Sequence, residues 1–452
     1  MGRCLFGLIL ILFSATGRAQ TDSLFIRQIA DEIFQHSTAY SNLYTLTKTI
    51  GPRLSGSAQT YSSEKWGQET LTRAGADHVY LQETKIPHWV RGGKDKAAMI
   101  SGGKRQSISV IALGNSVSTR PGGITAPLIT IMNFDELERR KNEVRGKIVF
   151  FNYPFNKNFV RTFVAYGDAV VYRAVGASRA AKYGAVGMLV RSMTESTDNI
   201  PHTGAMVYND SFPKIPALAV GLKDADKLAS SNQKDLQLYI STQARTLPDT
   251  VGYNVIGEWT GSEFPEQYIT VGGHLDSWDP AEGAQDDGAG CVQTIEILRA
   301  LKAIGYKPRH TIRFVLFTDE ENADRGAEKY LADAKAKNEK HIMAFESDGG
   351  GFTPRALSFK ATEAQMNVLR SWLPLFEPYG VSAITYDGAG TDVELLNDVL
   401  GIPAGQLITD SQRYFDYHHA AGDVFEIVNK RELELGAINM AALIYLTDKY
   451  GL

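Results

Sequence analysis

The chain has 452 residues, of which 43% are hydrophobic and 22% charged, and its formal net charge is −4. A soluble globular chain of this length usually divides into two domains. The slightly acidic balance excludes the basic surface that nucleic-acid binding needs, and no segment after the N-terminus approaches the roughly 20 apolar residues of a membrane span. We therefore expect neither a nucleic-acid partner nor a membrane span.

The N-terminus has the pattern of a secretory signal peptide. Arg3 precedes an apolar run from Cys4 to Phe13, and small and polar residues follow as far as Ala19. A short apolar core with small residues at the cleavage site is typical of exported proteins, whereas a membrane anchor needs about twice as many apolar residues. We assign residues 1–19 to a signal peptide and expect a periplasmic or secreted protein.

Residues 20–96 are expected to begin a domain that resumes at residue 243. The stretch 51–57 (GPRLSGS) is a loop by its glycine, proline and serine content. Arg53 in this loop could bind a substrate carboxylate, but a role in holding the loop is the better interpretation. The predicted helices of this segment are 24–35, 39–50 and 62–74.

Residues 97–242 differ in pattern, with short β-rich runs separated by glycine turns, and we interpret them as an inserted, lid-like domain. This stretch contains no cluster of metal ligands. His202 lies in the sequence PHTG, which predicts a surface loop and a hydrogen-bonding histidine rather than a ligand. The predicted strands are 147–152, 187–191 and 215–220, with a helix at 170–183.

Residues 243–452 alternate between strands and helices, which predicts an α/β fold with a mainly parallel sheet and helices on both faces. Cys291, the only cysteine left after signal removal, falls in the apolar register of a helix and is expected to be buried, without a disulfide. The predicted strands are 253–259, 267–272, 311–317, 341–345, 383–386 and 406–408, and the predicted helices are 290–303, 323–337, 361–373, 391–399 and 430–450.

Motifs of metal-binding residues recur along this last segment, and most of them follow predicted strands. Ligands in open parallel sheets gather at the carboxyl ends of the strands, so these motifs are expected to converge on one site. Their mixture of imidazoles and carboxylates suits two zinc ions about 3.5–4 Å apart, with one bridging carboxylate and a spare carboxylate as a base. The motifs are GGHLDSWD (272–279), QDDGAG (285–290), TDEEN (318–322), ESDGG (346–350) and YHHAAGD (417–423).

His274 is predicted to bind metal, with Asp276 as its orienting or neighbouring acid. A ligating imidazole usually donates its other N–H to a carboxylate or carbonyl, which fixes its tautomer. Two adjacent acids, Asp286 and Asp287, precede a glycine-rich helix start. A helix N-terminus explains one of them as a cap. We take Asp286 as the bridging ligand, and Asp287 as either the cap or a residue behind the ligands.

Glu320 and Glu321 leave a strand together, so their side chains can point in different directions. We assign Glu321 to the metal and Glu320 to the general base. Asp319 directly precedes them, and three acids in a row could also form an ordinary solvated turn. The context of the other motifs favours the functional interpretation.

Asp348 follows a strand and precedes three glycines that allow close backbone approach, which is consistent with a ligand. His419 completes the predicted set. Its neighbour His418 is the alternative, because adjacent histidines seldom both reach one site. Asp423, four residues beyond His419, is expected to orient that ring.

The motifs resemble those of the co-catalytic zinc exopeptidases, a family that includes bacterial aminopeptidases and glutamate carboxypeptidases. The resemblance covers nearly all of the mature chain and implies that the insert is a protease-associated domain. It implies two zinc ions per chain, short peptide substrates and a homodimer. It places His274 and Asp348 on one zinc, Glu321 and His419 on the other, and Asp286 between them, with Asp276 and Glu320 as catalytic acids. Further matching segments are GPRLSGS (51–57), IPHW (86–89), PHTG (201–204) and GTD (390–392).

The sequence therefore predicts a binuclear zinc exopeptidase that hydrolyses dipeptides or short peptides, with Glu320 as general base. Tyr414 or Tyr417 is a candidate donor to the oxyanion. One alternative is a glutaminyl cyclase-like acyl transferase with one zinc, and another is a metal-free binding ectodomain. The polar stretch 322–325 departs from the glycines that the family often has there. The direction of cleavage stays open.

Overall fold

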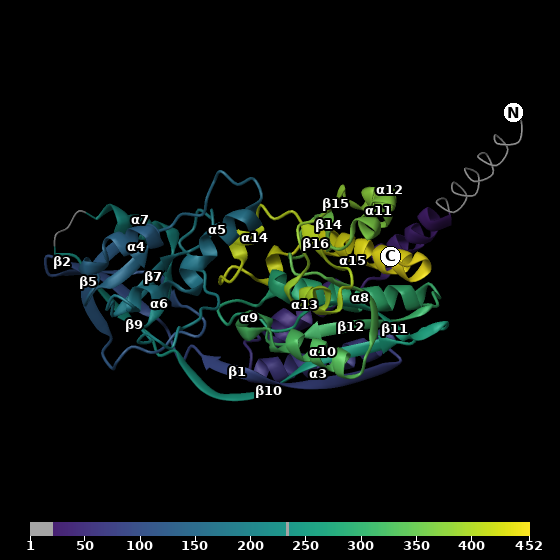
Figure 1. The fold of residues 1–452 in the computed structure, drawn as a ribbon, viewed down its shortest axis with the longest axis horizontal. Coiled ribbons are helices and arrows are strands. Elements are labelled where there is room, and N and C mark those ends of the chain that lie inside the picture. The colour runs from purple at the N-terminus through teal and green to yellow at the C-terminus, as the bar shows by residue number, and fades with distance from the viewer. Residues whose placement is uncertain (1–20, 232–234) are drawn as a thin grey trace, which may run out of the picture.

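A computed structural model describes residues 21–231 and 235–452. The predicted signal peptide, 1–19, lies outside the described residues. Within the described ranges, no helix is both long enough and apolar enough to cross a bilayer. The described residues form two eight-stranded sheets. The two sheets lie at opposite ends of the molecule (Figure 1).

The first sheet has the order β1-β10-β12-β11-β13-β16-β14-β15. Its centre is parallel, because β11 pairs in parallel with β12 and β13, and β13 with β16. The flanking pairs β1–β10, β10–β12 and β14–β16 are antiparallel, so the sheet is more mixed than the sequence predicts. The strands are β1 (His78–Val90), β10 (Arg245–Trp259), β11 (Phe264–His274), β12 (His310–Phe317), β13 (Lys340–Glu346), β14 (Pro354–Lys360), β15 (Ala383–Thr385) and β16 (Ala404–Thr409).

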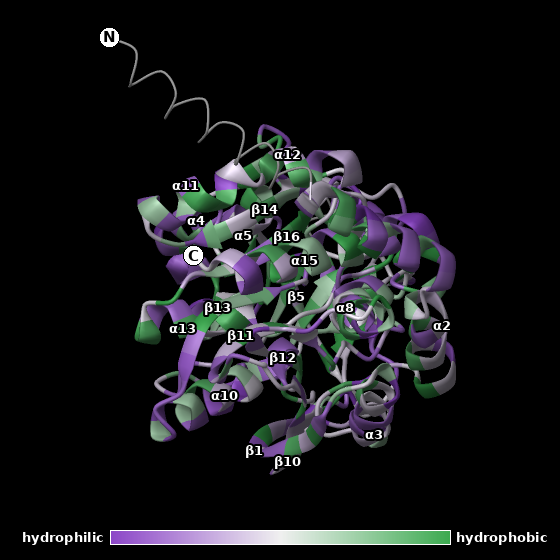
Figure 2. Ribbon diagram, turned by 90° about the vertical axis from the view of Figure 1, so that its right-hand side faces the viewer, coloured by the Kyte–Doolittle hydropathy of each residue, from purple (hydrophilic) through white to green (hydrophobic). Residues whose placement is uncertain are grey.

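Helices cover both faces of this sheet, and Figure 2 shows its hydrophobic strands between them. Every residue of β12 is buried, and alternate side chains such as Phe314 and Val315 enter cores on opposite faces. One face packs against α8 and α15, and the other against α10 and α13. The helices are α3 (Ala58–Ala74), α8 (Ala289–Ala303), α10 (Arg325–Ala336), α11 (Glu363–Ser371), α13 (Thr391–Leu400) and α15 (Lys430–Tyr450).

Two predicted helices divide in the structure, whereas residues 21–36 form one continuous helix. The predicted helix 39–50 becomes α2 (Ala39–Tyr44) followed by a π-helical turn, Thr45–Ile50. The predicted helix 323–337 is interrupted at Asp324, whose φ of 55° separates α9 (Glu320–Ala323) from α10. The long strand β1 was not predicted, because its polar and apolar residues alternate irregularly along a sheet edge.

The second sheet has the order β3-β2-β9-β5-β6-β7-β8-β4, with hydrophobic clusters of its own. The predicted strands of this region are β6, β7 and β8, which lie side by side in parallel. The strands are β2 (Lys96–Ser101), β3 (Lys104–Ile108), β4 (Val110–Ala112), β5 (Ile124–Ile131), β6 (Ile148–Phe151), β7 (Gly187–Arg191), β8 (Ala217–Val220) and β9 (Gln237–Ser241), and the helices are α4 (Phe134–Arg139), α5 (Thr162–Ala174), α6 (Gly176–Ala181) and α7 (Leu222–Ser230).

The two sheets are linked by neighbouring strands. The chain leaves the first sheet at Val90 and returns at Arg245, which is its partner in the β1–β10 register. Helix α5 lies beside α14 (Tyr414–Tyr417), at the carboxyl ends of the first sheet (Figure 1). A shared apolar cluster joins them, in which Ala165 and Ala169 of α5 accompany Tyr414 and Phe415. The second sheet is therefore held against the edge where the metal-ligand motifs end.

Candidate metal centre

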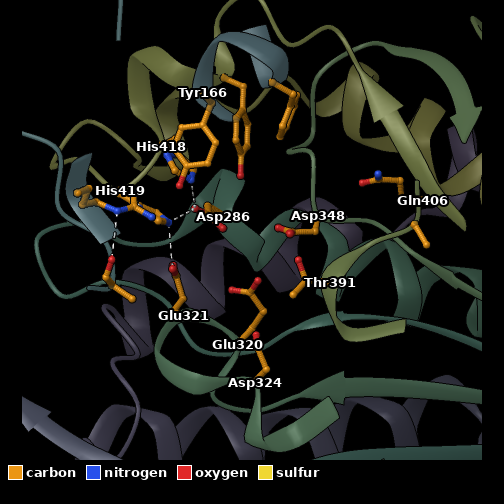
Figure 3. A pocket seen from close by; sticks show the side chains of 15 residues that line it. Tyr166, Asp286, Glu320, Glu321, Asp324, Asp348, Thr391, Gln406, His418 and His419 are labelled. Carbon is orange, nitrogen blue, oxygen red and sulfur yellow. Dashed lines mark hydrogen bonds and ion pairs between the residues drawn. The ribbon is translucent and has the colours of Figure 1, made fainter. Parts of the chain in front are cut away.

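A cavity of about 460 Å³ lies between the carboxyl ends of the first sheet and helix α5. Carboxylates dominate its wall, and Figure 3 shows Asp286 between His419 on one side and Asp348 on the other. The lining residues are Phe163, Tyr166, Arg173, Ala205, Asp286, Glu320, Glu321, Asp324, Asp348, Ala389, Thr391, Gln406, Tyr414, His418 and His419.

One half of the site, here called the His274 half, consists of His274, Asp348 and Oδ1 of Asp286. His274 is the last residue of β11, and its Nε2 lies 3.2 Å from Asp286 Oδ1 and 3.3 Å from Asp348 Oδ1. Its Nδ1 faces the backbone oxygen of Asp276 at 3.1 Å. The ring is thus fixed on one side and directed at two carboxylates on the other.

The other half, here called the His419 half, consists of His419, Glu321 and Oδ2 of Asp286. The Nε2 of His419 lies 3.0 Å from Glu321 Oε2 and 3.3 Å from Asp286 Oδ2 (Figure 3). The backbone N–H of Thr203, from the region of the second sheet, donates to the backbone oxygen of His419 at 2.9 Å. Asp286 therefore presents one oxygen to each half.

The geometry favours His419 over His418 as the ligand. The two rings stack with centroids 3.6 Å apart, and His418 Nε2 lies 3.7 Å from Asp286 Oδ2. By proximity alone, ligand atoms of Asp286, His418 and His419 form a group that could hold an ion. Only His419, however, also reaches Glu321, so we give it the greater weight.

Asp287 precedes Gly288, the N-cap residue of α8. It too lies close enough to His274 and Asp348 to be grouped with them as a potential ligand. Its Oδ2 accepts the backbone N–H of His274 at 3.0 Å, and its Oδ1 accepts that of Gly290 at 2.9 Å. Both oxygens thus already accept backbone N–H groups, one at the end of β11 and one in the first turn of α8.

Asp276 is fully buried behind the cavity, where it holds the turn that carries both glutamates. Its carboxylate accepts the backbone N–H groups of Glu320 at 3.1 Å and Glu321 at 3.3 Å, and the hydroxyl of Ser55 at 3.0 Å. It therefore acts on the site through other residues. Glu320 lines the cavity, and its Oε2 lies 3.9 Å from His274 Nε2, farther than the carboxylates of Asp286 and Asp348.

The ionisable groups of the site show how much negative charge is buried there. Burial raises the pKa of Glu320 well above its usual range and that of Glu321 to about 7. Burial opposes charge on the imidazoles, yet Glu320 and Asp348 raise the pKa of His274 well above its usual value. In the same way Glu321 and Asp286 raise the pKa of His419 to about 9. Such a site favours bound cations.

The residues present fit a divalent metal. Nε2 of His274, Oδ2 of Asp286 and Oδ1 of Asp348 are buried and have no hydrogen-bond partner. The first and third of these atoms lie 3.3 Å apart, and Asp286 Oδ2 lies 3.3 Å from His419 Nε2. Buried polar atoms are normally satisfied, and imidazole nitrogen with carboxylate oxygen is the donor set of zinc sites. A metal would satisfy these atoms and offset the buried charge.

Some predictions near the site need correction. His202 is not in a surface loop but is 5% exposed, and the backbone N–H of its neighbour Thr203 donates to the backbone oxygen of His419. Asp423 does not orient His419. Its carboxylate accepts the backbone N–H groups of Gln285 at 2.7 Å and Asp286 at 3.2 Å, and so it positions the central aspartate.

Arg53 has the predicted structural role. Its guanidinium is fully buried and donates to the backbone oxygens of Leu275 at 2.6 Å, Glu282 at 2.7 Å and Gly283 at 2.9 Å. These bonds join the loop 51–57 to the segments that carry the site. Cys291 is buried and unpaired, as expected.

Phe163, Tyr166 and Arg173 of α5 also line the cavity, and the sequence did not indicate them. They lie in the region without metal-ligand clusters, so only tertiary packing brings them to the site. Of the two tyrosines proposed as oxyanion donors, Tyr414 lines the cavity, whereas Tyr417 is not part of its wall.

Comparisons with known proteins identify relatives of this chain. A family model described as peptidase family M28 matches residues 254–444. Carboxypeptidase Q of Mus musculus is 35% identical over 410 residues, which cover 90% of this chain and 85% of that protein. The crystal structure of a peptidase M28 precursor from Shewanella amazonensis SB2B superposes with a TM-score of 0.90 at 31% identity, covering 95% and 97% of the two chains. BSAP, a zinc aminopeptidase from Bacillus subtilis, shares the fold with a TM-score of 0.64 at 20% identity, covering 90% and 93%.

Proposed function

The chain belongs to peptidase family M28, and from this premise we propose that it is a binuclear zinc exopeptidase acting on dipeptides or short peptides. The resemblance to zinc exopeptidases that the motifs indicated is confirmed, and the protein is a metallo-exopeptidase. Its relatives are named for cleavage at opposite ends of a peptide, so the direction of cleavage is left to experiment.

The observation that carries the two-metal proposal is the position of Asp286. Its Oδ1 lies 3.2 Å from His274 Nε2 and its Oδ2 lies 3.3 Å from His419 Nε2, so one carboxylate faces two separate imidazoles. Asp348 supplements the first imidazole and Glu321 the second. A bridging carboxylate with one carboxylate and one imidazole on each side suits a pair of zinc ions. All the predicted ligands converge, which disfavours the metal-free ectodomain.

In this proposal each residue around the metals has a distinct task. When bound, paired zinc ions lower the pKa of a water molecule and polarise a substrate carbonyl. Glu320, directed into the cavity, accepts a proton from the attacking water and passes it to the leaving amine. Asp276 holds Glu320 through its backbone N–H. Burial raises the pKa of Tyr414 well above its usual value, so its hydroxyl keeps the hydrogen that it can donate to the oxyanion.

We propose residues 97–242 as a protease-associated, lid-like domain inserted between the catalytic segments 20–96 and 243–452. The proposal is supported by helix α5 of this region, which forms part of the cavity wall. The signal peptide at 1–19 with export, and the homodimer, remain predictions. N-terminal sequencing of the secreted protein and sedimentation of the purified protein test them.

The test of the proposed function is metal reconstitution. Dialysed protein titrated with zinc is expected to bind two ions per chain and to regain peptidase activity. Full activity at one ion per chain overturns the binuclear site, and cyclisation of glutaminyl peptides would then favour the acyl transferase. Peptide binding without hydrolysis at any metal content would favour a binding ectodomain.

The substrate class is tested with a matched set of dipeptides. Free, N-blocked and C-blocked versions of one dipeptide are compared, with the products identified by mass spectrometry. Loss of cleavage on C-terminal blocking indicates a carboxypeptidase, and loss on N-terminal blocking an aminopeptidase. Loss with both indicates a dipeptidase.

A further inference from the structure

The imidazoles of the two halves have different partners behind them. At His274, Nδ1 faces the backbone oxygen of Asp276 at 3.1 Å. A carbonyl oxygen can only accept a hydrogen bond, so Nδ1 carries the hydrogen and donates it. In the neutral ring, Nε2 then has a free lone pair directed at the carboxylates of Asp286 and Asp348. His274 is thus prepared to bind a metal ion.

At His419 the arrangement is reversed. Its Nδ1 faces Nη1 of Arg173 at 3.4 Å. A guanidinium can only donate, so Nδ1 is the acceptor, and in the neutral ring the hydrogen lies on Nε2. In the charged ring both nitrogens carry hydrogens. In either state Nε2 directs a hydrogen at Glu321 Oε2, 3.0 Å away, where a metal ion would have to bind.

Arg173 is held firmly in this position. It is 8% exposed, and its Nε donates to the backbone oxygen of Ala205 at 3.2 Å. Among the described residues its guanidinium forms no direct ion pair with a carboxylate, and its Nη1 lies 3.4 Å from His419 Nδ1. Gly204 permits this approach, because a Cβ there would lie 2.4 Å from Arg173 Nη1 and 2.7 Å from His419 Nδ1.

We propose that the two metal positions are unequal, with the His274 half binding the first ion tightly and Arg173 weakening the second at the His419 half. An ion at His419 Nε2 requires the ring hydrogen to move to Nδ1, where it would meet the N–H of Arg173 rather than an acceptor. The guanidinium charge adds repulsion. The inference rests on the binuclear centre proposed above. Arg173 is a positioning residue in this scheme, since it acts on the metal through His419.

The test measures zinc affinity directly, independently of activity. Metal-free full-length protein is titrated with zinc against a chelating indicator, and bound zinc is counted after equilibrium dialysis. Wild-type protein is expected to show two classes of site that differ at least about tenfold. Partners of ligating histidines change metal affinity by about 10–100-fold, so Arg173→Gln should tighten the weak class by about tenfold or more. The amide oxygen of the new side chain can accept the hydrogen of Nδ1.

Matched variants test whether the charged donor at position 173 causes the weak binding of the second ion. Arg173→Lys keeps a charged donor and should leave the second class weak, whereas Arg179→Gln removes an exposed arginine of α6 and should change neither class. A measurement on wild-type protein avoids any folding defect of the variants. Anomalous diffraction from crystals grown with one equivalent of zinc should show the ion in the His274 half.

The outcomes distinguish this inference from the proposed function. Equal affinities, a first ion in the His419 half, or a second class that Arg173→Gln does not tighten would overturn the inference and leave the binuclear centre standing. Saturation at a single ion per chain would instead overturn the binuclear centre itself.

Discussion

The two halves of the metal centre are built in different ways. The His274 half comes from the ends of neighbouring parallel strands, β11 and β13, and its histidine is oriented by a backbone oxygen two residues away. The His419 half comes from a loop and a short helix, and its histidine contacts Arg173 and Thr203, which lie more than two hundred positions earlier. The first half follows from local order in one sheet. The second half depends on the inserted region through these two contacts.

The largest expected effect is on Glu320, which belongs to neither half. Glu320→Gln removes the general base while keeping the size of the side chain, so turnover should fall by roughly 10²–10⁴. Zinc content should stay at the wild-type level in both halves, as measured by metal analysis beside kcat. Glu328→Gln, an exposed residue of α10, serves as control. If Glu320→Gln loses a metal while Glu321→Gln keeps both, the roles of these neighbours are reversed.

The second prediction removes one ligand from each half. Asp348→Asn should weaken binding in the His274 half, and Glu321→Gln in the His419 half, because a ligating carboxylate must be charged. Each substitution should lower zinc affinity by about 100-fold, which is more than the loss expected from removing a residue that only hydrogen-bonds to a ligand. Zinc titration of both variants checks this. If either variant lost both classes of site together, the halves would not be separable.

A third experiment weakens both halves through Asp286. Asp423 holds the backbone of Gln285 and Asp286 with its two carboxylate oxygens. Asp423→Asn leaves only one acceptor, so Asp286 should lose part of its orientation. Zinc affinity should then fall by about tenfold in each half, the lower end of the range for partners of ligands. A loss confined to one half would contradict the central position of Asp286.

The smallest expected effect concerns the support of Asp276. The hydroxyl of Ser55 donates to Asp276 at 3.0 Å, and Ser55→Ala removes this bond. A net cost of about 1 kcal/mol would reduce turnover by about fivefold. Zinc content should not change, because the ligands keep their own partners. Steady-state kinetics with metal analysis tests this, and a loss of zinc would show that Ser55 supports the ligands themselves.

Much of the His274 half could be predicted from the sequence because its causes are local. Strands such as β12, buried on both faces, appear as continuous apolar runs, and their carboxyl ends mark where polar side chains gather. The position of Asp287 before a glycine-rich helix start suggested a cap, whereas in the structure Gly288 is the N-cap of α8 and Asp287 binds the backbone N–H groups of His274 and Gly290. The antiparallel flanks of the sheet were harder to predict, since edge strands such as β1 carry a mixed pattern.

The sequence by itself determined the alternation of strands and helices in the central part of the first sheet and the residues available to a metal, because periodicity and strand ends depend on consecutive residues. Tertiary structure decided the rest. It placed His419 rather than His418 against Glu321, directed Asp423 to Asp286, and buried His202. It also brought α5 to the cavity. These contacts join residues far apart along the chain, and local sequence patterns do not predict which distant surfaces pack together.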